Sequence, residues 1–337
     1  MTARERAAAL HRAVPSAVGH VDLPAELELA RQYGRRGVLS SYVPRLQAAG
    51  IRALIGAIFV HPQYLPEMAL SSALGQTAAL LAELEECRDF ALVRTAGELD
   101  AALDAGRIAV VLSMEGAEPL ARSPELLRPF HALGLRLLGL TWNHRNHAAD
   151  GCALSGGLTP AGRALAEAAW DLGLILDVSH LSDAGFWELL SLGDGPVLAS
   201  HSNCRALCAH PRNLTDAQLI QLGRRGGVIG VNQVRFLVRE GPCGLADLAD
   251  HLLHIEAVSG PGHAALGLDL ARDYTQALPK PRAFWETWDL AAEDLLPDYD
   301  ALPALTACLL ERGAGQDTVT GILGGSLLSF LRRHLPP

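Results

Sequence analysis

Short runs of nearly continuous apolar residues recur along the chain, and most of them are four to eight residues long. A strand buried on both faces carries such a run, because neither of its faces alternates with polar residues. The pattern therefore predicts eight buried strands in a parallel sheet. The predicted strands are Ala17–Leu23, Ile51–Val60, Ile108–Met114, Leu135–Trp142, Leu174–Val178, Pro196–Ser200, Gly227–Asn232 and Ala264–Leu270.

The segments between these runs have the apolar spacing of helices. Thr159–Leu172 opens with threonine followed by proline, which is typical of an N-cap and the first helical position. Asp183–Leu192 and Asn213–Leu222 have similar spacing, and in the second of these Thr215 and Gln218 fit a capping box. Parallel strands need crossover connections of this kind.

Alternation of strand and helix, eight times over, predicts a (β/α)8 TIM barrel. Three regions are longer than one crossover requires and are expected to add helices. They are Ala78–Leu103, Arg282–Arg312 and Asp317–His334. The Pro- and Gly-rich patches are typical of loops rather than of a domain linker, so we expect residues 1–337 to form a single domain.

Composition and charge narrow the classes of function. Hydrophobic residues make up 49% of the 337 positions, enough for a large core, and the formal charge of −9 leaves no basic stripe for a nucleic acid. The first residues lack the apolar segment of a signal peptide, and no uncharged apolar run of ~18 residues follows. We therefore expect a soluble cytoplasmic protein that binds neither nucleic acid nor membranes.

The six cysteines are scattered too thinly for a disulfide framework. Cys204 and Cys208 have a C-x3-C spacing close to His201 and His210, which raises the alternative of a zinc knuckle. A second close pair that would complete four ligands is missing from the sequence. Ordinary buried thiols are the favoured interpretation.

Metal-ligating residue types stand at or just after the carboxyl ends of five predicted strands. One such histidine alone is more often structural, but in a barrel all these ends surround one face. Imidazoles and carboxylates without thiolate suit Zn²⁺ or a similar ion. Six ligands are too many for one catalytic ion, so two ions bridged by a carboxylate are favoured. The candidates are His20, Asp22, Glu115, His180, His201 and Asp269.

From about Gly19 to Leu331 the chain resembles the membrane dipeptidase (renal dipeptidase) family of metallopeptidases, within the amidohydrolase superfamily. The resemblance rests on ordered motifs, and two blocks of them are highly specific. One joins GLTPAGR to DVSHLSD, and the other joins ASHSN to HPRN. Further matching pieces are GHVDLP, LSMEGAEPL, LTWNHRNHAADG, GVIGVN, GLDL and ILGGSLLSFL.

The resemblance implies a binuclear zinc site and assigns its ligands. His20 and Asp22 would bind one zinc ion, and His180 and His201 would bind the other. Glu115 would bridge the two ions. The family also implies a TIM barrel, and its members are commonly homodimers.

Two further residues receive catalytic roles from the resemblance. Arg212, in HPRN, would hold the carboxylate of the substrate's C-terminal residue, a role that suits a guanidinium. Asp269 would take a proton from the bridging water and deliver it to the leaving amine. The implied activity is hydrolysis of dipeptides, including those with a D-residue at the C-terminal position.

The chain departs from the family pattern around the expected substrate. GHND is GHVD here, and the second-strand segment Ile51–Phe59 lacks the usual polar and aromatic residues. Trp142 stands where many members have a histidine that is thought to polarise the scissile carbonyl. Trp142 is then a candidate substrate contact, and the nearby His144 is the candidate for the catalytic role. Ala271 and Ser326 replace a second aspartate and an asparagine.

These departures leave the substrate open. The leading hypothesis is a zinc-dependent dipeptidase. One alternative keeps the metal site and makes the chain a deacylase of N-acyl amino acids, with Arg212 holding the same carboxylate. A third, less favoured hypothesis is a barrel that binds metal and a ligand without catalysis; the full ligand set argues against it.

Overall fold

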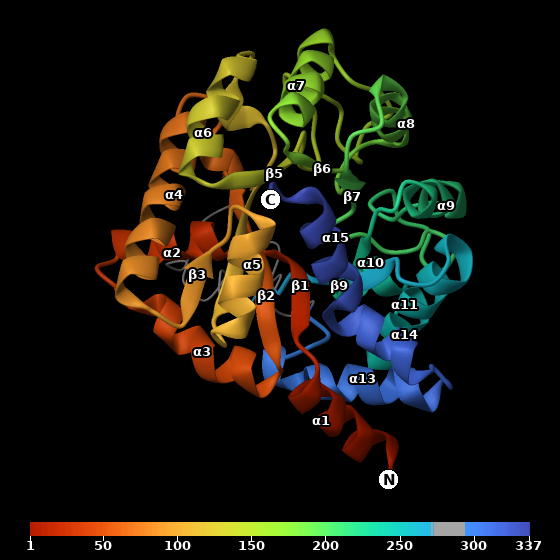
Figure 1. Cartoon of the computed structure of the whole chain (residues 1–337). Helices are drawn as coiled ribbons and strands as arrows, with labels where there is room; N and C mark the ends of the chain where they lie inside the picture. Colours follow the sequence, from red (N-terminus) through yellow and green to blue (C-terminus); the bar gives the residue numbers. More distant parts are fainter. Residues whose placement is uncertain (271, 273–293) are drawn as a thin grey trace.

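The computed structural model describes residues 1–270, 272 and 294–337, and its centre is a barrel of parallel strands (Figure 1). All eight predicted strands are present, although several are shorter than their apolar runs. The barrel strands are β1 Ser16–Val21, β2 Ile51–Phe59, β4 Ile108–Glu115, β5 Leu135–Gly139, β6 Ile175–Asp177, β7 Val197–Leu198, β8 Ile229–Asn232 and β9 Ala264–Leu268.

The strand order β7-β6-β5-β4-β2-β1-β9-β8 is that of a nearly closed barrel. Every pairing along this path is parallel. Just beyond β7, Ala199 forms a parallel bridge with Ile229 of β8. There the Ala199 amide donates to the Val228 carbonyl over 2.9 Å, and the Gly230 amide donates to the Ala199 carbonyl over 2.7 Å. These bonds close the barrel at its seam, between β7 and β8, and confirm the predicted fold class.

Helices surround the strands, and the caps predicted at Thr159 and Thr215 are confirmed. Thr159 and Ser182 cap α7 and α8 by accepting amide hydrogens, and Thr215 forms the predicted capping box with Gln218 at α9. The helices are α1 Ala3–Ala13, α2 Leu23–Gln32, α3 Val38–Ala48, α4 Ala69–Glu86, α5 Ala96–Asp104, α6 Leu127–Leu133, α7 Pro160–Asp171, α8 Asp183–Leu192, α9 Asp216–Arg224, α10 Arg235–Val238, α11 Leu245–Ser259, α13 Leu302–Glu311, α14 Gln316–Thr320 and α15 Ser326–His334.

The helices predicted within Ala78–Leu103 are present as parts of α4 and α5, but the region also contains a strand that was not predicted. Between α4 and α5 lies a ninth short strand, β3 Phe90–Leu92, which pairs with β4 off the barrel path. Phe90 is fully buried, so this short strand adds a side chain to the hydrophobic core beside β4. Three residues are too few for a strand pattern to stand out between two helices.

The helices predicted for the C-terminal tail are present within residues 294–337. α13, α14 and α15 lie within it, and a π-helical turn, Gly321–Gly325, joins the last two. Part of Arg282–Arg312 and all of Ala271 lie outside the described residues. Among the helices that the structure describes, none has the length and apolar character needed to cross a membrane.

Small and branched side chains fill the barrel, and α15 closes one end of it. Val111 shares its face of β4 with Glu115, because alternate residues of a strand point the same way. Val111 belongs to a buried cluster that also contains Leu327 and Phe330 of α15. The terminal helix therefore fills the barrel at the end opposite the metal-ligand candidates.

Three glycines surround the backbone carbonyl of Ser200, just past the seam. A Cβ added to Gly19, Gly230 or Gly267 would lie 2.6, 2.0 or 2.7 Å from the Ser200 carbonyl oxygen. Contacts this short do not occur between real atoms, so only glycine lets these strands approach the Ser200–His201 peptide. We call these residues the glycine floor.

Gly230→Ala should destabilise the chain by about 1–3 kcal/mol or more, the usual cost of overpacking a filled core. The new methyl group can only displace backbone, since its nearest neighbours are the Ser200 carbonyl and the Gly267 Cα. Urea unfolding of the metal-free chain measures the change. The control is Gly97→Ala in α5, where the nearest atom would lie 3.7 Å away. That variant should be neutral or slightly more stable, because alanine favours helix; equal losses in both variants would contradict the explanation.

Candidate metal centre

The six candidate ligands meet at the carboxyl ends of the strands, as the barrel requires. Two of these residues have unusual backbone conformations: φ is 70° at His180 and 59° at Asp269. Leu268, which precedes Asp269, also has a positive φ, of 51°. Residues other than glycine adopt such angles at a cost, and they collect at functional sites. The barrel therefore holds these side chains in directions that an ordinary strand end would not provide.

One half of the cluster is built around His20. Its Nε2 atom lies 3.6 Å from Asp22 Oδ1, 3.6 Å from Glu115 Oε2 and 3.9 Å from Asp269 Oδ1. His20 and Asp22 come from the end of β1, whereas the other two carboxylates arrive from β4 and from the residue after β9. Strands far apart in sequence thus contribute one imidazole and three carboxylates to this half.

The other half is built around two imidazoles. The Nε2 atoms of His180 and His201 lie 2.9 Å apart. Both face the second oxygen of Glu115, with Oε1 at 2.8 Å from His180 and 3.4 Å from His201. Glu115 therefore turns one oxygen to each half, which is the arrangement of a bridging carboxylate.

Hydrogen bonds set the tautomers of these two imidazoles. His180 Nδ1 lies 2.8 Å from the side-chain oxygen of Asn143, which can only accept, so Nδ1 carries the hydrogen. His201 Nδ1 lies 2.6 Å from the Ser200 hydroxyl. Burial lowers the pKa of both imidazoles well below the usual value. Both rings are therefore neutral at pH 7, as metal ligands must be.

The donor set fits a cation. With hydrogen on each Nδ1, the Nε2 lone pairs of His180 and His201 face each other and Glu115 Oε1 with no hydrogen between them. In the other half, Asp22 Oδ1 is buried without a hydrogen-bond partner. Buried acceptors are otherwise paired. Lone pairs that converge in this way are compensated by a positive ion, and imidazole with carboxylate suits zinc.

The carboxylates strengthen the preference for positive charge. Burial raises the pKa of Glu115; the nearby imidazole of His20 lowers it, and the charges of Asp22 and Asp269 add to the rise. Burial alone would lower the pKa of His20, but these carboxylates outweigh it and raise that pKa. The buried, negatively charged carboxylates are therefore more stable with a cation between them than without one.

Arg212 lies beside this cluster and is 5% exposed. Its Nη1 donates to the Ser202 hydroxyl and its Nη2 to the His201 carbonyl, each over 2.8 Å. No carboxylate of the described residues lies within ion-pair distance of this guanidinium, and burial lowers its pKa. A buried cation with spare N–H donors and no anionic partner is a site for an anion.

Asp269 is held by a residue that the sequence patterns did not single out. Asn232, the last residue of β8, donates from Nδ2 to Asp269 Oδ2 over 2.8 Å. Burial raises the pKa of Asp269, although this hydrogen bond and His20 lower it. Asn232 ends a predicted strand, so the rule that found the histidines could have found it too. Asn143, which orients His180, had no such signal.

Trp142 and His144 take different positions. The Trp142 ring lies 5.4 Å from that of Phe59 and 6.2 Å from that of His180, so it forms a wall of the site. His144 is exposed and meets Trp142 edge-on at 6.0 Å. Within the described part of the chain, no contact brings His144 to the metal-ligand cluster.

The alternative of a zinc knuckle does not hold. Cys204 and Cys208 are buried, and their thiols face the carbonyls of His251 and Phe236. The potential metal clusters of the described residues contain no cysteine. These two residues are ordinary core thiols, as the sequence favoured.

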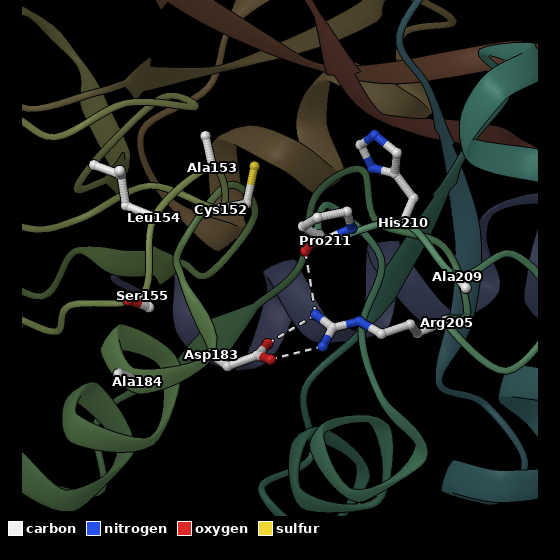
Figure 2. A pocket seen from close by; sticks show the side chains of 10 residues that line it. All are labelled: Cys152, Ala153, Leu154, Ser155, Asp183, Ala184, Arg205, Ala209, His210 and Pro211. Carbon is white, nitrogen blue, oxygen red and sulfur yellow. Dashed lines mark hydrogen bonds and ion pairs between the residues drawn. The ribbon is translucent and has the colours of Figure 1, made fainter.

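A cavity of about 600 Å³ lies between Cys152–Ser155, in the loop after β5, and the loop after β7 that carries Arg212, with the start of α8 beside them (Figure 2). At its base Arg205 pairs with Asp183 through two bonds of 2.6 and 2.7 Å and donates to the Pro211 carbonyl over 3.1 Å. This bracket ties the residue before Arg212 to the first turn of α8. These bonds of Arg205 help to fix the position of the Arg212 guanidinium beside the metal-ligand candidates.

Comparisons with known proteins agree with this geometry. The model of the membrane dipeptidase family (peptidase family M19) matches residues 4–334. The Aspergillus oryzae dipeptidase aclJ is 32% identical over 67% of this chain and 51% of its own length. The Clonostachys rogersoniana dipeptidase verJ is 30% identical over 71% of the chain and 59% of its length. The chain thus spans about half the length of these curated relatives.

Solved structures with the same fold include two metallopeptidases. Dipeptidase AC, of family M19, is 27% identical with a TM-score of 0.82, covering 96% of this chain and 99% of its own. A Rhodobacter sphaeroides metallopeptidase, solved with a phosphinate mimic of L-Ala-D-Ala, is 26% identical with a TM-score of 0.81. That alignment covers 95% of this chain and 99% of the relative.

Proposed function

The chain belongs to the membrane dipeptidase family of metallopeptidases, and on that premise we propose that it hydrolyses dipeptides with a pair of zinc ions. The observation that carries the proposal is Glu115, whose two oxygens face separate sets of imidazoles. A carboxylate placed in this way is what a two-metal hydrolase needs.

The residues of each half would hold one ion. His20 and Asp22 would bind the first, His180 and His201 the second, and Glu115 both. Ions bound there supply Lewis-acid polarisation of the scissile carbonyl and a more acidic water. Trp142 and Phe59 would shield one side of the reacting bond from bulk water, which strengthens charge interactions inside the site.

Arg212 would bind the substrate by the carboxylate of its C-terminal residue. The guanidinium is buried and is held by Ser202 and the His201 backbone, so it cannot follow a longer peptide outward. Because its position relative to His201 is fixed, the peptide bond that reaches the metal ligands is the one next to that carboxylate. This geometry limits the substrate to a single residue on the C-terminal side of the scissile bond.

Asp269 would move the proton. Asn232 occupies its Oδ2 atom, which leaves Oδ1, on the side of His20, to hold a proton. A carboxyl whose pKa is raised by burial keeps a proton more readily than one in water. Asp269 is thus suited to take a proton from the attacking water and to deliver it to the leaving amine.

A D-residue at the C-terminal position is part of the proposal. Support comes from the Rhodobacter sphaeroides relative, whose structure contains a mimic of L-Ala-D-Ala. The test is a panel of L-L dipeptides, L-D dipeptides and N-acyl amino acids, assayed with the zinc-loaded chain alongside its metal content. Dipeptide turnover with close to two zinc ions per chain is expected. Turnover of N-acyl amino acids alone would replace the proposal with a deacylase.

Arg212→Met should lower kcat/KM for dipeptides by about 10²-fold. Two hydrogen bonds to a charged partner are worth about 3 kcal/mol together, and about 1.4 kcal/mol corresponds to a tenfold change. The matched control is the same dipeptide with an amidated C-terminus, which removes the carboxylate from the substrate instead. The variant should barely change turnover of the amide; an equal loss on both substrates would contradict the carboxylate contact.

A further inference from the structure

Asp177 is a buried carboxylate that the mechanism above does not use. It is the last residue of β6 and is 5% exposed. Its Oδ1 atom accepts from the amides of Ser179, over 2.9 Å, and Ser200, over 3.0 Å. Its Oδ2 atom accepts from the Ser200 hydroxyl. Both oxygens therefore act on the loops that carry the two imidazoles of one metal half.

The Ser200 hydroxyl links this carboxylate to His201. A hydroxyl has one hydrogen, and Ser200 gives it to Asp177, since a carboxylate only accepts. The same oxygen lies 2.6 Å from His201 Nδ1, so it must accept the hydrogen of that nitrogen. Nδ1 then carries hydrogen, and the Nε2 lone pair of His201 is left to face Glu115 and His180.

The surroundings keep this chain of bonds in one direction. The three glycines of the glycine floor pack closely around the Ser200 carbonyl, which restricts movement of this residue. Ser179 offers the Ser200 hydroxyl another acceptor only at 3.5 Å, the weak limit of such a bond. Ser179 already accepts from the His201 amide over 3.1 Å. Asp177 is thus the partner that decides where the hydrogen of Ser200 points.

We propose that Asp177 is a positioning residue, which acts through Ser200 to hold His201 in the tautomer that binds metal. The inference rests on the proposed function only in taking His201 as a metal ligand. Partners that orient metal-bound histidines are typically worth about 10–100-fold in metal affinity. Asp177 does not touch the substrate, so its effect reaches catalysis only through the zinc of this half.

Asp177→Asn is the direct test, because asparagine has the same shape. Its side-chain oxygen can keep both backbone amide bonds, while its nitrogen donates to the Ser200 hydroxyl. That hydroxyl must then donate to His201 Nδ1, which moves the ring hydrogen to Nε2, the metal-binding atom. We expect one of the two zinc ions to bind about 10–100-fold more weakly, as measured by competition with a chromophoric chelator.

A second readout follows the tautomer itself. Nitrogen-15 shifts of the His201 ring in the metal-free chain should show hydrogen on Nδ1 in the parent and on Nε2 in Asp177→Asn. A purely structural role would lower the urea midpoint of the metal-free chain without moving either the shifts or the zinc affinity. That result would overturn the proposal.

Two serine variants complete the design. Ser200→Ala removes the link while Asp177 keeps its backbone bonds, so it should also weaken one zinc, and it serves if Asp177→Asn does not fold. The double variant Ser200→Ala/Asp177→Asn should bind zinc only slightly more weakly than Ser200→Ala alone. The effects of two substitutions in one hydrogen-bond network are not additive. Additive losses would overturn the link through Ser200.

Ser179→Ala is the matched control. It removes an equally buried hydroxyl of the same network that does not touch an imidazole ring. Its zinc affinity should stay close to that of the parent, and a loss as large as that of Asp177→Asn would overturn the proposal. Because zinc competition needs no substrate, a parent chain that binds zinc but hydrolyses no dipeptide would refute the proposed function alone.

Discussion

Replacing Glu115 with glutamine is expected to lower kcat/KM by about 10³-fold or more. Glutamine has one acceptor oxygen, so its amide nitrogen must face either His20 or the His180–His201 pair, where the parent has a carboxylate oxygen. A donor there repels a cation, and one negative charge is lost from between two positive ions. Metal ions contribute several kcal/mol to such reactions, and each 1.4 kcal/mol is about tenfold.

Metal content distinguishes this explanation from general damage. Glu115→Gln should retain less than two zinc ions per chain after dialysis, as measured by elemental analysis. Glu118→Gln is the matched control, because Glu118 is another partly buried carboxyl, three residues further on and outside the ligand cluster. It should keep both ions. If Glu115→Gln also kept two ions and full activity, Glu115 would not be the bridge.

Asp269→Asn should lower kcat by about 10²–10⁴-fold, the range for loss of a general acid–base group. The amide has the shape of the carboxyl and can keep the contact with Asn232, but it cannot carry a proton between water and the leaving amine. KM should change little, because Arg212 still holds the substrate carboxylate. Steady-state kinetics on one L-D dipeptide separate the two constants.

Zinc content and inhibitor binding serve as controls for Asp269→Asn. Both ions should remain, since the five proposed ligands are untouched. A phosphinate dipeptide mimic, which needs no proton transfer, should bind the variant about as well as the parent. Full kcat in the variant would remove Asp269 from the proton-transfer role, whereas loss of metal would make it a ligand.

Much of the architecture can be predicted because the barrel imposes a simple pattern. Strands buried on both faces leave unbroken apolar runs, and the shared direction of parallel strands brings their ends together. His20, Glu115 and His201 could therefore be placed near one another before any coordinates. β3 could not be predicted, because three residues between two helices leave no periodic signal.

Directions of individual atoms are beyond what such patterns convey. Nothing in the spacing shows that Glu115 turns one oxygen to each half, or that Asn143 and Ser200 set the tautomers of two imidazoles. These depend on side-chain rotations and on backbone dihedral angles such as the positive φ of His180. The wall formed by Trp142 and Phe59 likewise joins segments whose contact depends on side-chain rotation rather than on strand order.

The glycine floor has a consequence for how this site can change. Gly19, Gly230 and Gly267 place bare backbone under the Ser200–His201 peptide. Most barrel sites can be raised, lowered or tilted by exchanging a side chain in the layer beneath them. Under His201 that layer has no side chain to exchange, so laboratory evolution that repositions this half of the site should succeed through mutations in the loops around the mouth and fail through mutations from below.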